Sequence, residues 1–344
     1  MRQYNLRTTG LIQLGAGRLV GGLLAWQLLA GTGAASVVAT EGFSGKVFFH
    51  YTYDTVKGAS HGRNEFALSR VYLTYQKAIA DDVNVKLTTN VSRTGSAWTV
   101  FQKIAAVQWD SPWGEIILGL QGMNLWNVSE ANWGYRFVEK TPMDRHRFAS
   151  SADMGIGFKR TFGQRLHLHA TLTNGPGFRK VEDDRFKRLA TQVVYGATNL
   201  GTAAGYNLGV TLSLEPEEVL QAAGTVTEIK PLWTLFAGLS RGRLRVGAEF
   251  DRYRDTWIDG PRTQQILAAY ANLQLRPRLA LFGRVDMYVT DFRDREERYV
   301  ILGANYAVAG KLHIAPNVRL KNADFAAPDQ IGLSSINLSV EFKY

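Results

Sequence analysis

The chain has 344 residues and no cysteine, and its 40 Lys or Arg against 30 Asp or Glu give a formal net charge of +10. Without cysteine, a disulfide framework, a thiolate nucleophile and a zinc–sulfur site are all excluded. Hydrophobic residues make up 45% of the chain and aromatic residues 11%, a composition that excludes general disorder. The basic balance leaves nucleic acid, a membrane surface or an anionic solute as candidate partners.

The first 39 residues have the layout of a secretory signal peptide. Arg2, Arg7 and Arg18 are followed by an apolar run over residues 19–39 that ends in small residues, with no acid among them. The alternative is a retained transmembrane anchor, because the run is long enough to span a bilayer. Four glycines in the run disfavour a stable helix, so we expect residues 1–39 to be cleaved and residues 40–344 to form the mature protein. An exported protein is not expected to bind nucleic acid.

Strict alternation of apolar and polar residues marks the C-terminus. Residues 336–344 (INLSVEFKY) place an apolar side chain at every second position and end on the aromatic Tyr344. A strand with this pattern has one apolar and one polar face, as a barrel strand between hydrocarbon and water requires. The nonapeptide resembles the terminal strand of bacterial outer-membrane barrels. The same alternation recurs upstream, as in residues 47–53, 83–91, 166–172, 206–212, 244–250 and 300–306.

Turn signals divide residues 40–344 into about 16 candidate strands. The strands are centred near residues 50, 71, 87, 106, 118, 156, 169, 191, 209, 236, 247, 270, 283, 303, 316 and 339. Short connections alternate with longer ones, which we expect near residues 55–64, 123–152, 174–186, 214–231, 252–264, 290–298 and 321–333. This alternation is typical of the short periplasmic turns and long outer loops of a membrane barrel. We therefore predict an all-β fold, a transmembrane antiparallel β-barrel of about 16 strands, with about 14 or 18 strands as alternatives that also leave a substantial lumen.

The longest expected connection, residues 123–152, is the third outer loop and is rich in aromatic residues. A loop of this length is usually functional, and its aromatic side chains favour packing against an inner wall. Motifs within and after it resemble uncharacterised bacterial porins related to the phosphate-selective porin O/P group, namely Trp133-Gly134-Tyr135-Arg136, Glu139-Lys140-Thr141, Ser150-Ser151-Ala152-Asp153-Met154-Gly155 and Asn174-Gly175-Pro176-Gly177. The resemblance implies that this loop folds into the lumen and sets a constriction. Phosphate porins line their pores with a ladder of arginines, which has no residue-by-residue match in this sequence.

Residues opposite the apolar face of each strand are expected to face the lumen. Cations outnumber acids at these positions, which predicts a preference for anions, with phosphate or similar oxyanions among the candidates. The expected pore-lining cations are Lys46, Arg70, Lys86, Arg188, Arg243, Arg245, Arg284 and Arg319 on the strands, and Arg136, Lys140, Arg145 and Arg147 on the third outer loop. The alternative is that these charges only solvate the interior and pair locally, as Arg245 with Glu249 and Arg284 with Asp286 would.

These patterns together predict a porin of the bacterial outer membrane, a channel for passive diffusion of small hydrophilic solutes. The expected partners are outer-membrane lipid, lipopolysaccharide and small anionic solutes, and the resemblance to 16-stranded porins implies a homotrimer. No enzymatic activity, cofactor or metal is expected, because the sequence has no nucleophile elbow, zinc-binding helix or P-loop, and His167 with His169 are too few ligands for a metal site. The alternatives are a barrel enzyme similar to an outer-membrane phospholipase and a secreted soluble β-protein.

Overall fold

The computed structural model describes residues 41–344 except residues 57–60, 183, 222–223, 258–259, 292–294 and 323–330. The expected signal peptide, residues 1–39, lies outside the described residues. Most of the described chain is β-strand, and all of its strands belong to one sheet. In the described part of the chain, no helix combines the length and the apolar character that crossing a membrane requires.

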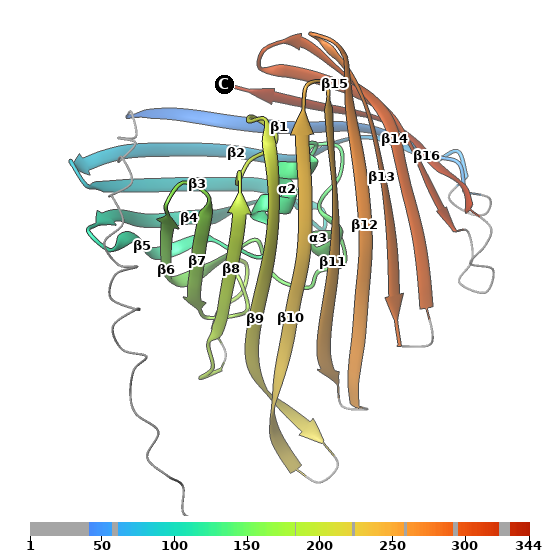
Figure 1. Cartoon of the computed structure of the whole chain (residues 1–344). Coiled ribbons are helices and arrows are strands. Elements are labelled where there is room, and N and C mark those ends of the chain that lie inside the picture. Colours follow the sequence, from blue (N-terminus) through green and yellow to red (C-terminus); the bar gives the residue numbers. More distant parts are fainter. Residues whose placement is uncertain are drawn as a thin grey trace, which may run out of the picture. The chain divides into compact units, whose positions relative to one another are not determined.

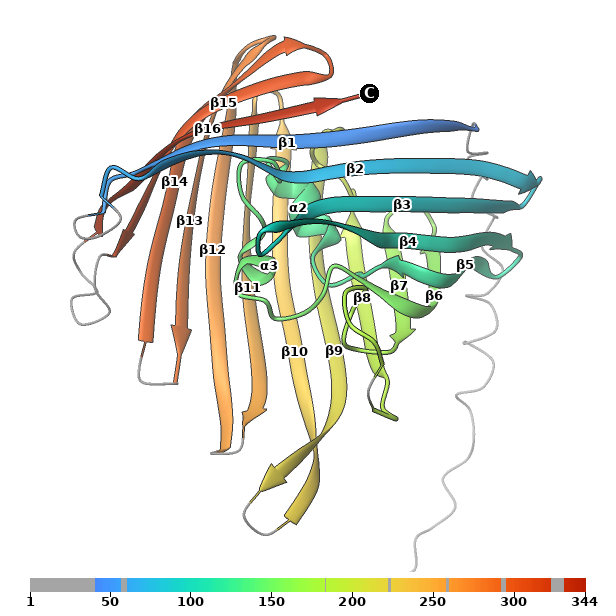
Figure 2. The same ribbon diagram turned by 180° about the vertical axis from the view of Figure 1, so that it is seen from behind.

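In the described residues, sixteen antiparallel strands form a closed barrel in which β1 pairs with β16. The strands are β1 (Gly42–Asp54), β2 (Asn64–Ala80), β3 (Val83–Thr94), β4 (Ala97–Ser111), β5 (Gly114–Gly122), β6 (Ala152–Phe162), β7 (Leu166–Thr173), β8 (Arg188–Gly196), β9 (Gly205–Gln221), β10 (Gly224–Arg241), β11 (Leu244–Trp257), β12 (Gly260–Arg276), β13 (Leu279–Thr290), β14 (Arg295–Ala309), β15 (Leu312–Asn322) and β16 (Ile331–Lys343). Apart from the closing pair, each strand pairs with its neighbours in sequence (Figures 1 and 2). The predicted antiparallel barrel is confirmed, and every expected strand centre lies inside an observed strand.

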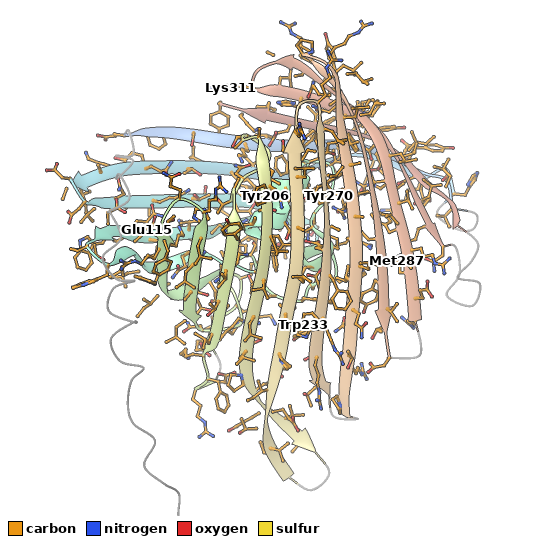
Figure 3. All side chains as sticks on the ribbon, viewed as in Figure 1. Glu115, Tyr206, Trp233, Tyr270, Met287 and Lys311 are labelled. Carbon is orange, nitrogen blue, oxygen red and sulfur yellow. The ribbon has the colours of Figure 1, made fainter. Side chains whose placement is uncertain are left out.

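The barrel exposes apolar side chains and buries polar ones, the reverse of a water-soluble protein. On β9, Leu208 and Val210 are 54% and 47% exposed, whereas the alternating residues Asn207 and Thr211 are 3% and 1% exposed. Tyr206, on the same outer face as Leu208, is labelled in Figure 3. A soluble monomer rarely exposes so extensive an apolar surface, and an outer face of this kind suits contact with hydrocarbon.

Three of the expected long loops, near residues 214–231, 252–264 and 290–298, are instead extensions of the strands. The ladder of β9 and β10 continues as far as Gln221 paired with Gly224, and the two other hairpins are similarly extended. The acidic run over residues 215–218 does not interrupt β9, because neighbouring cations neutralise it. Lys230 Nζ on β10 lies 2.6 Å from Glu217 Oε2. The expectation of loops there is wrong, since charge alone does not distinguish a solvated loop from a paired strand.

The connections at the other end of the barrel are short, as predicted. They comprise residues 81–82, 112–113, 163–165, 242–243, 277–278 and 310–311. One connection at this end, residues 197–204 between β8 and β9, is longer, and its Leu200 is buried. The C-terminus also lies at this end, where Gly45 N donates to Tyr344 O at 3.1 Å and Tyr344 N donates to Gly45 O at 3.2 Å. The terminal aromatic residue thus extends the seam that closes the barrel.

The described connection between β5 and β6, residues 123–151, contains the helices α2 (Asn127–Trp133) and α3 (Pro142–Arg145). Its bounds agree with the predicted long loop, and it is called the β5–β6 loop below. α2 ends at Gly134, whose left-handed φ of 76° allows its N–H to donate to Glu130 O. α3 begins after Thr141, whose side chain accepts a hydrogen bond from Asp144 N. The loop is therefore built from capped turns of helix and is locally ordered.

Candidate functional site

The C-terminal end of α2 is fixed to strands β11, β12 and β13. The Trp133 ring centroid lies 5.8 Å from that of Tyr270 on β12 and 5.9 Å from that of Phe282 on β13. The Trp133 carbonyl accepts hydrogen bonds from Arg245 Nη2 and Asn272 Nδ2, both at 3.1 Å. In both ribbon views α2 and α3 lie between the near and the far strands (Figures 1 and 2). Carbonyls in the last turn of a helix have no partner within it, so these donors satisfy and anchor that end.

Glu139 forms a second anchor between the β5–β6 loop and the wall. Its Oε2 accepts from the Tyr299 hydroxyl at 2.9 Å and lies 3.2 Å from Arg319 Nη1. Arg319 Nη2 also donates to the carbonyl of Val138 at 2.8 Å. Burial acts to raise the pKa of Glu139, but the charges of Arg319 and Arg284 and the hydrogen bond from Tyr299 lower it to about 2. The Glu139 carboxylate is therefore ionised at all ordinary pH values.

Buried ion pairs lie beneath the loop on β13 and β14. Arg284 donates through Nε and Nη2 to the two carboxylate oxygens of Asp286, both at 2.8 Å, and both side chains are almost fully buried. Arg284 Nη1 donates to the carbonyl of Lys140 at 2.7 Å, and Arg145 Nη2 lies 2.5 Å from Glu297 Oε1. The predicted local pairing of Arg284 with Asp286 is confirmed. These cations hold the loop and are not free to meet a solute.

Three other expected pore-lining arginines are differently placed. The expected pairing of Arg245 with Glu249 is wrong, because the Arg245 guanidinium donates to the carbonyl at the end of α2. Arg188 is buried and forms an ion pair with Glu215, an acid that the unexpected extension of β9 places on the inner face. Arg243 lies in the turn between β10 and β11 and is exposed, so its expected place on the wall is wrong.

The accessible face of the β5–β6 loop carries charges of both signs. Arg136 Nε lies 2.9 Å from Glu130 Oε2, and its Nη2 lies 3.1 Å from Asp144 Oδ2. Lys140 Nζ lies 3.6 Å from Asp144 Oδ1 and its side chain is 34% exposed. Arg147 is exposed and has a φ of 61°, a left-handed conformation that is uncommon for a residue other than glycine. The predicted loop cations thus include Arg136 and Lys140, paired within the loop, and the exposed Arg147.

The inner wall formed by β1–β4 also carries cations, and its Phe48 packs against Phe137 of the β5–β6 loop. It carries the expected cations Lys46, Arg70 and Lys86, and two cations that the sequence analysis missed lie at the same wall, Lys103 on β4 and Arg179 in the connection between β7 and β8. Among the described residues, none of these five side chains has a carboxylate within ion-pair distance. All five are at least partly exposed. We call Arg70, Lys103 and Arg179 the basic cluster.

Lys103 was missed because a β-bulge reverses the alternation in β4. Thr88 pairs with Ile104, but the next residue, Thr89, pairs with Gln102, so Lys103 is an extra residue in its strand. The outward apolar positions of β4 accordingly change from even to odd numbers along the strand. That change of parity is visible in the sequence and would have indicated the bulge.

Among the described residues, no group of three or more metal-ligating side chains is present. His167, one of the two histidines considered in the sequence, has its ring nitrogens 3.0 Å from Thr161 Oγ1 and 3.0 Å from the carbonyl of Gly196. These neighbours satisfy a pore-lining or rim histidine without a metal ion.

No family model and no curated protein sequence matches the chain. Several solved structures, however, match its fold. An anion-selective porin from Comamonas acidovorans has a TM-score of 0.65 at 10% identity, over 89% of this chain and 99% of the porin. The outer membrane channel DcaP of Acinetobacter baumannii has a TM-score of 0.64 at 13% identity, over 92% and 100%. OmpT of Vibrio cholerae, in a trimer form, has a TM-score of 0.57 at 10% identity, over 89% and 99%. The chain therefore has the fold of the outer-membrane porins.

Proposed function

We propose that the protein is a porin that forms a water-filled channel for passive diffusion of small hydrophilic solutes. The observation that carries this proposal is the closed barrel of sixteen described strands, with apolar side chains exposed outside and polar side chains within. Barrels of about 16 strands leave space for an aqueous channel, whereas barrels of about eight strands are filled by side chains or one small ligand. The fold shared with solved porins supports the same function.

The β5–β6 loop folds into this channel and sets its narrowest section. Its anchors at Trp133 and Glu139, on inward-facing residues of β11–β15, support this part of the proposal. A loop held by buried ion pairs and aromatic packing keeps its position as solutes pass. The loop therefore packs mainly against a covered wall, from β8 to β15. It also touches Phe48 on the wall formed by β1–β4, but it leaves the cations of that wall at least partly exposed, and we call this the uncovered wall.

The channel prefers anions, with phosphate and similar oxyanions among the candidate solutes. Carboxylates pair with Arg188, Arg284 and Arg319 on the covered wall and with Arg145 of the loop, so those cations contribute little field to the channel. On the uncovered wall, the charges of Lys46, Lys86 and the basic cluster have no carboxylate partner among the described residues. Unbalanced charge beside a low-dielectric wall raises the local concentration of the opposite ion.

The protein's place and partners follow from the same proposal. Residues 1–39 direct export, and the exposed apolar face of the strands contacts outer-membrane lipid and lipopolysaccharide. The channel assembles as a homotrimer, a state that the trimer form of one structural neighbour supports. Small anionic solutes pass through each barrel.

An outer-membrane barrel enzyme of the phospholipase kind needs a serine, a histidine and a group that orients the histidine. Among the residues that the structure describes, His50 comes nearest to this arrangement, with Nε2 2.8 Å from Ser69 Oγ. Its Nδ1 faces Ser339 Oγ at 3.3 Å, where such a mechanism requires a carboxylate or an amide. The geometry therefore favours the channel.

Reconstitution of the mature protein into planar bilayers tests the proposal. We expect stepwise conductance and, in a potassium chloride gradient, a reversal potential that shows chloride passing more readily than potassium. Channels that prefer potassium would overturn the anion preference alone. Absence of conductance from protein that shows a heat-modifiable band on gels, and is therefore folded, would overturn the channel itself.

A further inference from the structure

The connection between β7 and β8 reaches across to the hairpin of β3 and β4. Arg179 Nη2 donates to Ser92 Oγ at 3.2 Å, and the Arg179 Cζ lies 4.6 Å from the ring centroid of Phe101 and 5.3 Å from that of Phe178. The two phenylalanine rings meet edge to face at 6.3 Å. Backbone hydrogen bonds fix this segment, since Phe178 N donates to Ala152 O at 3.0 Å. Arg179 and Phe178 are therefore held at defined positions on the inner wall.

Lys103 joins the same aromatic group from β4. Its Nζ lies 4.8 Å from the Tyr72 ring centroid and 5.9 Å from that of Phe178, and it donates to the Tyr72 hydroxyl at 3.3 Å. Arg70, two residues before Tyr72 on β2, adds a third cation to this wall. Burial and the neighbouring charge of Arg70 lower the pKa of Arg179.

The loop bounds the basic cluster on its other side. Burial is the main reason that the pKa of Lys140 is lowered, and although Asp144 opposes this shift, the charges of Arg136 and Arg70 add to it. Tyr72, whose ring lies under Lys103, packs against a buried cluster that includes Phe137 and Val138 of the β5–β6 loop. The basic cluster and its rings lie beside the narrow section of the proposed channel.

Among the described residues, the aromatic rings here leave some N–H groups of the neighbouring cations without an acceptor. A cation over a ring is attracted to its face but keeps N–H groups that a carboxylate or other oxyanion can accept from. Tyr72, Phe101 and Phe178 are themselves partly exposed. A solute that carries both a negative group and a flat ring can use both features, whereas an anion without a ring uses only the charges.

We propose that the basic cluster, together with Tyr72, Phe101 and Phe178, is a binding subsite for aromatic carboxylates on their way through the channel. This proposal rests on the proposed function and names a solute class for it. The carboxylate lies among Arg70, Lys103 and Arg179, and the ring of the solute packs against the exposed ring edges of the wall.

Benzoate, acetate and the uncharged benzamide are suitable probes in planar bilayers containing the full mature chain. We expect benzoate to reduce chloride conductance at a concentration about fivefold lower than acetate, because only benzoate gains the ring contacts. Benzamide should have little effect at the same concentrations. Equal potency of benzoate and acetate in channels that still prefer chloride would overturn the subsite and leave the porin proposal intact.

Substitutions can distinguish the contribution of the aromatic rings to benzoate binding from that of the positive charges. Phe178→Leu should bring benzoate close to acetate in potency with an unchanged chloride preference, and Arg179→Gln should weaken both anions. Lys180→Gln is the matched control, because Lys180 is an exposed cation next to Arg179 in the same connection, and its variant should keep the benzoate advantage. If Phe178→Leu gives no heat-modifiable band, Lys103→Gln tests the same subsite from β4. A benzoate advantage that survives Phe178→Leu, or unchanged potency of both anions in Arg179→Gln or Lys103→Gln, would contradict the proposal.

Discussion

On β13 and β15, Arg284 and Arg319 face the β5–β6 loop, and carboxylates and loop carbonyls take up their N–H groups. On β2 and β4, Arg70 and Lys103 occupy equivalent inward positions, yet they are partly exposed and have no described carboxylate partner. The strands are alike in their alternation, so the difference comes from the loop. A charge that the loop removes from water must be paired, whereas a hydrated charge need not be. Basic side chains therefore anchor the β5–β6 loop on the covered wall, whereas on the uncovered wall they provide the electrostatic field of the channel.

Replacing Arg284 should give the largest effect. Arg284→Ala leaves the buried carboxylate of Asp286 without its bidentate partner, which should cost about 3–5 kcal/mol of unfolding free energy. Denaturant unfolding followed by tryptophan fluorescence measures this loss. Arg70→Ala is the control on the uncovered wall and should change the unfolding free energy by less than about 0.5 kcal/mol. Similar losses from both variants would remove the distinction between the walls.

Trp133→Ala should release the end of α2 from β12 and β13. Removing a fully buried aromatic side chain costs about 3–5 kcal/mol, of which most should appear as weaker loop anchoring. We expect a higher and noisier single-channel conductance, because a loosened loop no longer holds a fixed constriction. Trp98→Ala, at a 51% exposed position on the outer face, should leave the conductance unchanged. A normal conductance for folded Trp133→Ala protein would show that the loop does not set the narrow section.

The Glu139 anchor should depend on pH in a defined direction. Its pKa is lowered from 4.5 to about 2 in the folded protein, so its stabilising effect is complete above about pH 4.5 and is lost as the pH falls towards 2. The effect should be on the order of 2 kcal/mol at neutral pH. The difference in melting temperature between wild type and Glu139→Gln should therefore be constant from about pH 8 to 5 and shrink in stronger acid. A difference that shrinks between pH 8 and 6 would mean that another group carries the anchor.

Reversing a charge on the uncovered wall should give the smallest change in free energy but the clearest change in selectivity. Lys103→Glu should lower the ratio of chloride to potassium permeability by about two- to threefold. Arg243→Glu changes the net charge equally but lies in an exposed turn, so it should leave this ratio nearly unchanged. Reversal potentials in a potassium chloride gradient measure both variants. Equal shifts would show that net charge, and not its placement on this wall, controls selectivity.

The sequence predicted that basic residues would occupy inward positions at the candidate site, but it predicted few of their individual partners. Alternation placed Arg70 and Arg284 correctly on inward positions and also predicted the pairing of Arg284 with Asp286. It failed at Lys103, where a bulge shifts the register of β4, and at Arg188, whose partner Glu215 lies in a part of β9 expected to be a loop. Both errors have the same origin, because a period of two is informative only while the register is unbroken and the strand ends are known.

The sequence by itself determined the barrel. Each strand must present one face to hydrocarbon and one to water, and this local requirement is written residue by residue in the alternation that ends at Tyr344. The tertiary structure alone decided which inward cations are neutralised. That outcome depends on where the β5–β6 loop comes to lie against strands more than a hundred residues away, as in the hydrogen bond from Arg245 to the carbonyl of Trp133. Pairing across such a separation is set by the folded geometry, and the alternation of residues along the sequence does not reveal it.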